Sequence, residues 1–134
     1  MKWITREHPK IDRVACPWFI TRFIDKQAAT GAIPYDVPGV DLTHVGELCS
    51  FDAFLKKNLL DTPALHRLAV IVRGADTNQL HIAPQSAGLL AISLGLSRNF
   101  RNDFEMLAHG MVLYDALFAW CTELGAETHS WKYP

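Results

Sequence analysis

The chain has 134 residues, of which 49% are hydrophobic and 20% are charged, and its formal net charge is -1. These proportions are typical of a globular domain and exclude a disordered or fibrous chain. Because 13 basic residues balance 14 acidic ones, no overall field would attract nucleic acid or an anionic membrane. We therefore predict one domain over residues 1–134, with no direct nucleic-acid binding and no membrane association.

The three cysteines, Cys16, Cys49 and Cys121, are odd in number and far apart, which does not suggest a disulfide framework. The first ten residues do not resemble a signal peptide. The longest apolar run, from Ala87 to Leu96, is shorter than the roughly 20 residues that cross a bilayer. We expect a cytoplasmic protein with reduced thiols.

The N-terminal segment predicts a strand followed by a helix. Lys2–Thr5 is typical of a short strand, and Cys16 followed by Pro17 indicates an N-cap and a first helical position. This helix is expected to extend to about Ile24.

A second short strand and a hairpin are predicted next. Ile33–Asp36 is expected to be extended, and Leu42–Val45 and Leu48–Phe51 form a hairpin around a two-residue turn. This register places His44 directly opposite Cys49 on the apolar face of the hairpin.

The remainder of the chain predicts four helices, namely Asp52–Leu59, Thr62–Gly74, Pro84–Arg98 and Asn102–Leu124. Thr62 precedes a proline, which is a second cap-and-proline start. The helix that follows Pro84 is apolar nearly all round and is expected at the centre of the bundle. The predicted fold is therefore α+β, mostly α: a bundle of four to five helices with a small N-terminal β-sheet or hairpin.

The last predicted helix is apolar on two opposite sides. Its residues at helical spacing are, on one side, Phe104, Leu107, Ala108, Met111, Asp115 and Phe118 and, on the other, Leu113, Leu117 and Trp120. Such a helix must be covered on both sides by its own chain or by another subunit. We therefore expect a homo-oligomer.

Cys16 is the first candidate for chemistry, as a catalytic thiol. A thiol at a helix N-cap lies beside unpaired N–H groups and the positive end of the helix dipole, which favour the thiolate. The alternative is a small buried residue, since cysteine is often buried. Arg6 and Arg13 are nearby in sequence and suit a tetrahedral oxyanion, while Asp12 could pair with either.

A metal site is the second candidate. His44, Cys49 and Asp52 supply three ligand types that zinc or iron accepts, and three ligands leave one position open for catalysis. No CxxC, HxxxH or HExxH spacing accompanies them. The alternative is a core histidine that is hydrogen-bonded to the backbone.

Asp115 falls near the middle of one apolar side of the last helix, so we expect it to be buried and paired. The candidate partners are Arg13, Arg22 and Arg73. A structural ion pair is the simplest role for this carboxylate.

Three blocks of the sequence together resemble a known family. These are IDRVACPW at residues 11–18, CSFD at residues 49–52 and IVRGAD at residues 71–76, and the similarity extends over nearly the whole chain. The chain resembles the chromate-resistance domain at the C-terminus of ChrB-type proteins. The resemblance implies a role in chromate resistance or in chromate-responsive regulation, and it assigns DNA binding to an N-terminal region outside this domain.

The resemblance strengthens several candidate residues, because they lie within blocks similar to the family. It implies an oxyanion-binding set of Arg6, Arg13 and His44, together with Arg73, and it supports Asp76 as a neighbouring acidic residue. One departure is that only residues 26–30 separate RFID at residues 22–25 from GAIP at residues 31–34. Members of the family have a longer stretch at this place, where the predicted sheet lies.

Two functional hypotheses follow. The first is a module that binds or senses a small tetrahedral oxyanion such as chromate, without turnover. The second is a small metal-dependent or thiol-dependent enzyme that uses His44, Cys49 and Asp52 around zinc or iron, or Cys16 as a nucleophile.

Overall fold

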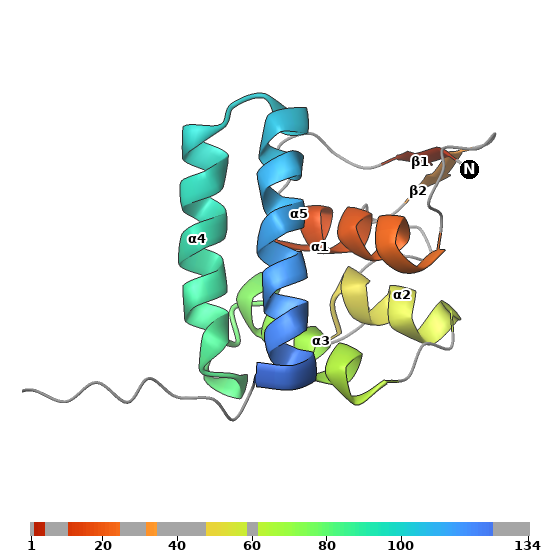
Figure 1. Ribbon diagram of the computed structural model, residues 1–134, viewed down its shortest axis with the longest axis vertical. Helices are drawn as coiled ribbons and strands as arrows, with labels where there is room; N and C mark the ends of the chain where they lie inside the picture. Colours follow the sequence, from red (N-terminus) through yellow and green to blue (C-terminus); the bar gives the residue numbers. More distant parts are fainter. Residues whose placement is uncertain (1, 5–10, 25–31, 35–47, 59–61, 125–134) are drawn as a thin grey trace, which may run out of the picture.

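The computed structural model describes residues 2–4, 11–24, 32–34, 48–58 and 62–124 (Figure 1). Most of these residues are helical. The elements in chain order are β1 (Lys2–Ile4), α1 (Ile11–Phe19), the π-helix η1 (Ile20–Ile24), β2 (Ala32–Pro34), α2 (Ser50–Asn58), α3 (Pro63–Asp76), the 3-10 helix η2 (Leu80–Ile82), α4 (Gln85–Asn99), α5 (Asp103–Ala119) and the π-helix η3 (Trp120–Leu124).

The prediction of an α+β fold with a small N-terminal sheet or hairpin is wrong, whereas the helical bundle fits. The strands in the described residues are β1 and β2, three residues each, which pair in parallel beside the bundle, and Leu48 adds a single bridge residue. These segments are too short to form a layer of the fold. The predicted hairpin also fails, because Phe51 of its second strand lies in α2, while its residues 42–47 lie outside the described part of the chain.

The first helix begins at Ile11, six residues before Pro17, its predicted first position. Cys16 and Pro17 lie inside α1, so Cys16 is not an N-cap. The physical reason is an apolar face that begins upstream: Ile11, Val14 and Trp18 are buried at helical spacing. Pro17 deprives one earlier carbonyl of its N–H partner, and the helix widens into η1 three residues later.

The central helix is α3, which contacts α1, α2, α4 and α5. The Thr62 hydroxyl accepts a hydrogen bond from the Leu65 N–H at 3.2 Å, and Pro63 occupies the first turn, so the predicted helix start is confirmed. The helix continues past the predicted end at Gly74 as far as Asp76. A Cβ atom at Gly74 would overlap Ser86 on α4, so glycine serves close packing here rather than helix termination.

The prediction that the helix after Pro84 forms the centre of the bundle is wrong. Eight of the 15 residues of α4 are exposed, and only Ser86, Leu89 and Ser93 are buried. The helix lies antiparallel to α5 at one side of the molecule (Figure 1). None of the helices in the described ranges is both long enough and apolar enough to cross a membrane.

An aromatic cluster joins α1 to α2 and α5. Four aromatic rings surround Trp18. The distances from the centroid of the Trp18 ring to theirs are 5.6 Å for Phe23, 6.5 Å for Phe51, 6.1 Å for Tyr114 and 5.4 Å for Phe118. Aromatic pairs at these separations add to the hydrophobic gain from burial. The cluster therefore fixes how α1 is placed between α2 and α5.

The close approach of α5 to α1 depends on a second glycine. A Cβ atom at Gly110 would overlap a methyl group of Val14. One turn later, the buried Tyr114 hydroxyl donates to the backbone carbonyl of Ile11 at 3.1 Å. Both contacts require the two helix backbones to lie near each other.

We expect Gly110→Ala to lower the free energy of unfolding by about 1–3 kcal/mol, because the added methyl group overpacks the contact between α1 and α5. In a Val14→Ala background the overlapping methyl group is absent. There the same change should be neutral or stabilising, since alanine favours a helix over glycine by about 1 kcal/mol. Urea unfolding of the two single variants and the double variant measures this coupling. Equal effects of Gly110→Ala in both backgrounds would contradict it.

Candidate functional site

The Asp52 carboxylate connects two helices that carry predicted site residues. Its Oδ2 accepts hydrogen bonds from the Cys49 backbone N–H at 3.0 Å and from the Cys49 thiol at 3.2 Å. Its Oδ1 accepts from Nη1 of Arg73 on α3, also at 3.2 Å. The structure thus brings together Cys49, Asp52 and Arg73, three of the predicted site residues.

The local sequence explains the position of Asp52. Cys49 precedes α2, and its carbonyl accepts from the Ala53 N–H, so Cys49 occupies the N-cap position. An acidic residue three positions later can reach back to the N-cap N–H, as in one half of a capping box. Its negative charge is also favoured at this end of the helix dipole. Capping of the N-terminus of α2 therefore explains why an acidic residue stands at position 52 and why its side chain points toward Cys49.

Burial makes this pairing different from a surface ion pair. The Asp52 side chain is 10% exposed, that of Arg73 is 24% exposed, and Cys49 is fully buried. Arg73 hydrogen-bonds Asp52 through Nη1 alone, and no other described residue accepts from its guanidinium. The remaining N–H groups of this planar group can donate hydrogen bonds to an anionic ligand.

The metal prediction is only partly covered by the described residues. Cys49 and Asp52 are adjacent, while His44 lies outside these ranges. Within them, no group of three or more His, Cys, Asp or Glu side chains could hold a metal ion.

The other predicted site residues are placed as follows. Arg6 lies outside the described part of the chain, and Asp12 and Arg13 belong to α1, with side chains that are not described. Cys16 is fully buried in α1, which removes the N-cap basis for a thiolate. Asp76 is the last residue of α3, close to one turn after Arg73.

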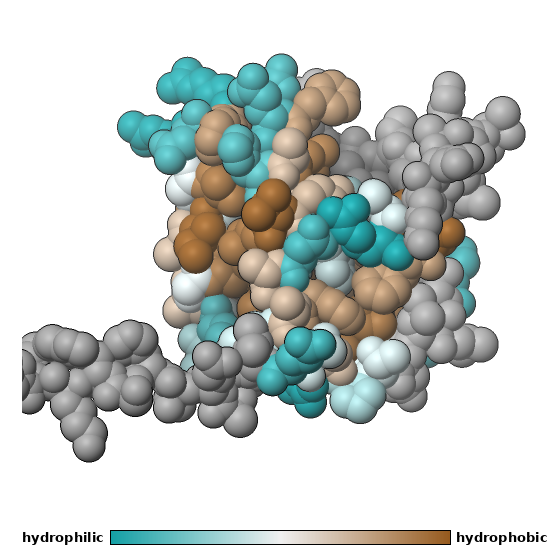
Figure 2. Space-filling view, in the orientation of Figure 1, coloured by the Kyte–Doolittle hydropathy of each residue, from teal (hydrophilic) through white to brown (hydrophobic). Residues whose placement is uncertain are grey.

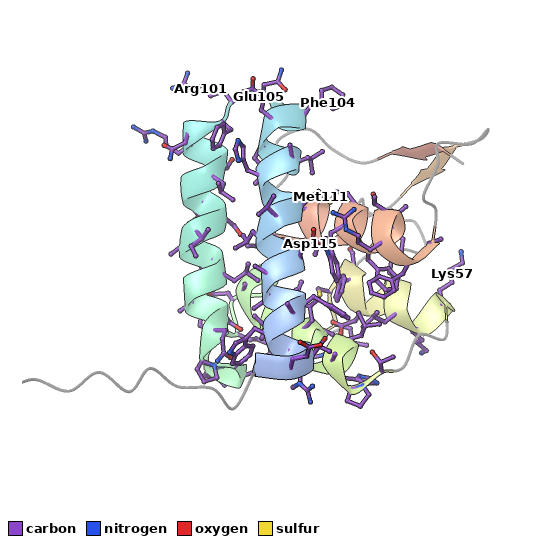
Figure 3. The ribbon with its side chains drawn as sticks, in the orientation of Figure 1. Lys57, Arg101, Phe104, Glu105, Met111 and Asp115 are labelled. Carbon is purple, nitrogen blue, oxygen red and sulfur yellow. The ribbon has the colours of Figure 1, made fainter. Side chains whose placement is uncertain are left out.

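A second acidic residue, Asp115 on α5, holds η1 against α5. Its Oδ1 accepts from Trp18 Nε1 at 2.8 Å and from Arg22 Nε at 2.9 Å, and its Oδ2 accepts from Arg22 Nη2 at 2.8 Å. Figure 3 shows Asp115 projecting from α5 toward α1. Arg22 was one of the three predicted partners, and this partner is confirmed. The expected burial is wrong, since the Asp115 side chain is 46% exposed.

The hydrogen bonds from Arg22 lower the pKa of Asp115 below its usual value; the bond from Trp18 lowers it further, while partial desolvation opposes both. Trp18 was not among the predicted partners of Asp115. A signal was available, because Trp18 and Arg22 are four residues apart and therefore share a helix face.

Cys121 does not provide a reactive thiol. It is buried, and this burial raises the pKa of its thiol. Its backbone carbonyl accepts two hydrogen bonds from the guanidinium of Arg67, the one from Nε at 2.8 Å. None of the three cysteines forms a disulfide.

Comparison with known proteins gives two matches. A family model described as the ChrB C-terminal domain matches residues 3–121. The chain is also 31% identical over 129 residues to Protein ChrB of Cupriavidus metallidurans, a match that covers 87% of this chain and 40% of that protein. The chain thus spans less than half the length of this relative. No solved structure matches.

We expect Asp115→Asn to reduce stability at neutral pH by up to about 1 kcal/mol, as is typical of exposed ion pairs. Because folding lowers the pKa of Asp115, its contribution is present above the unfolded value of about 3.9 and is lost as the pH falls through the folded value. The difference between wild type and variant should therefore shrink below about pH 4. Denaturant unfolding across pH measures it.

An NMR titration of the Asp115 carboxyl provides the control. Its pKa should rise toward the usual value in Arg22→Gln and rise less in Trp18→Phe, because Arg22 is the larger cause. An unchanged pKa in Arg22→Gln would show that the ion pair does not form in solution.

Proposed function

This chain belongs to the family of ChrB C-terminal domains, and from this premise we propose that it is a chromate-resistance domain that binds or senses a tetrahedral oxyanion. Chromate is the ligand to test first, because the family connects the chain to Protein ChrB. In this proposal the domain acts in the cytoplasm, where its thiols stay reduced.

The observation that carries the proposal is the incomplete pairing of Arg73. Arg73 contacts Asp52 through one nitrogen at 3.2 Å and is partly buried. Arg22 provides the contrast within the same molecule, because two of its nitrogens bind both oxygens of Asp115. A guanidinium whose remaining donors are available can bind an oxyanion through two parallel hydrogen bonds, whereas Arg22 already uses this geometry.

Asp52 acts as a positioning residue in this proposal. Its carboxylate receives two hydrogen bonds from Cys49 as well as the one from Arg73. The two Cys49 donors offset part of its negative charge, which reduces repulsion of an anion near Arg73. The carboxylate also fixes the direction of the guanidinium, so less side-chain entropy is lost when a ligand binds.

Arg6, Arg13 and His44 complete the proposed oxyanion site, on the basis of the sequence. All three lie within the matched range, and Arg13 belongs to α1, which packs directly on α2 and α3. A tetrahedral dianion is best bound by several cationic or N–H donors that approach from different sides. A protonated His44 would add such a donor at mildly acidic pH.

The second candidate function is a metal-dependent or thiol-dependent enzyme. It is favoured by one observation, the 3.2 Å contact between the Cys49 sulfur and an Asp52 oxygen, which are two of the three proposed ligands of zinc or iron. His44 would be the third ligand. Cys16 as an alternative nucleophile would require an opening in the core, because the residue is fully buried.

We expect isothermal titration to detect chromate binding to the wild-type protein and a loss of at least about tenfold in affinity in Arg73→Gln. A charge-assisted hydrogen bond of about 1.5–3 kcal/mol accounts for this loss. Arg6→Gln and Arg13→Gln should also weaken binding. The matched control is Arg101→Gln, which removes an exposed arginine between α4 and α5 (Figure 3).

Parallel titration with sulfate separates binding from redox chemistry. Sulfate has the same tetrahedral shape and charge as chromate but does not oxidise the three thiols. Equal affinity of the wild type and Arg73→Gln for both anions would contradict a role of Arg73. Uniform weakening that includes Arg101→Gln would indicate a non-specific effect of charge.

Elemental analysis of purified, untagged protein tests the second candidate. The metal-site hypothesis expects stoichiometric zinc or iron in the wild type and its loss in a His44→Ala, Cys49→Ala double variant. A Cys121→Ala variant, which removes a cysteine outside the proposed site, should keep the metal. Metal content that is the same in all three proteins would contradict a His44–Cys49 site.

A further inference from the structure

One exposed face of the molecule is largely apolar along two helices, and the exposed Glu105 and Asp115 border it on α5. On α4 it contains Gly88, Ile92 and Gly95, and on α5 it contains Phe104, Ala108 and Val112. We call these six residues the α4–α5 face. Ile92 is 51% exposed, Val112 is 67% exposed and Phe104 is 84% exposed, so large apolar side chains are open to solvent. Figure 2 shows hydrophobic side chains over these helices, with hydrophilic ones around the connection between them.

The composition of α4 sets this face apart from an ordinary surface. The helix carries no charged residue from Gln85 to Ser97, although more than half of its positions are exposed. A solvent-facing helix normally places charged residues on its outer side. Depletion of charge at the centre, with polar residues at the rim, is typical of a protein interface.

The face contains both recesses and projections. A Cβ atom at Gly88 or Gly95 would meet nothing within 4 Å, so these glycines are not required for packing inside the chain. Each lies within one turn of the exposed Ile92, and the two glycines leave shallow recesses on either side of it. Glycine is less favourable than alanine inside a helix. Two glycines on an exposed helix face are therefore explained if another molecule packs closely against the backbone there.

We propose that the occupant of the α4–α5 face is the same face of a second copy of this chain, related by a two-fold axis. In such an interface, residues near the axis meet their own copies. A charge there would meet an identical charge, whereas Gly88, Ile92 and Gly95 are compatible with themselves. The Ile92 side chain of each copy packs over a glycine recess of the other.

The size of the face agrees with this occupant. A helix of 15 residues is about 22 Å long, and two neighbouring helices with their side chains are roughly 20 Å wide. The projected area is then on the order of 450 Å² per copy, and the accessible area exceeds the projection because side chains are rough. Two such faces bury about 1,000 Å², which is the lower limit for a biological interface and fits a weak, reversible dimer.

Sedimentation velocity of the full chain without added ligand tests the proposal. We expect a reversible dimer for the wild type. In Ile92→Glu and in Val112→Glu the dissociation constant should rise at least 100-fold, since each change buries an unpaired charge in an apolar interface. The matched control is Leu94→Glu, an exposed leucine on α4 that points away from Ile92 and should leave the dimer unchanged.

A second pair of variants separates association from folding. Gly88→Ala combined with Gly95→Ala has room in the monomer and should preserve or raise its helicity, yet it should weaken the dimer at least tenfold. A monomeric wild type, a dimer that survives Ile92→Glu with intact circular dichroism, or a dimer dissociated equally by Leu94→Glu would overturn the proposal. Chromate binding plays no part in any of these measurements.

Discussion

The enclosure of α3 is the constraint on which the rest of the structure depends. Most of its circumference is buried, so neighbouring helices must cover it from several directions. Two of its features make this possible. A side-chain cap at Thr62 satisfies one of the N–H groups at its start, and Gly74 lets α4 approach near its end. The Ser86 hydroxyl on α4 donates to the Ile71 carbonyl on α3 at 2.9 Å, and this buried hydrogen bond also holds the two helices together.

This enclosure also determines the chemistry of the two arginine–carboxylate pairs. Arg73 projects from the edge of the buried helix and reaches Asp52 at the start of α2, where little solvent remains. Arg22 lies beyond the aromatic cluster and pairs with Asp115 where both side chains are more than 40% exposed. A bidentate pair at the surface is a structural link of modest energy, whereas a singly bonded, partly buried guanidinium keeps donors for a ligand. An arginine–carboxylate pair can therefore support ligand binding at Arg73 and Asp52, whereas the pair of Arg22 and Asp115 is structural.

Several sequence signals were compatible with two structures, and packing selected between them. Cys16 followed by Pro17 is typical of a helix start, yet burial of Ile11 and Val14 extends the helix upstream of it. Cys49 and Asp52 were interpreted as the end of a hairpin and a nearby ligand. Their spacing of three residues is equally that of a capping box, which is how α2 begins. Asp115 was expected to be buried because it follows an apolar side of its helix, but its own side chain is 46% exposed beside Arg22.

By itself, the sequence determined the helices that follow Thr62, Pro84 and Asn102, and it identified the family through short blocks of residues. Caps and prolines act within one turn, so these signals do not require the rest of the chain. Only the tertiary structure decided which charged groups meet, since Arg73 and Asp52 are 21 residues apart and Arg22 and Asp115 are 93 apart. It also decided that α4 lies at the surface rather than the centre, because the apolar composition of a helix does not specify whether its own chain or another copy covers it.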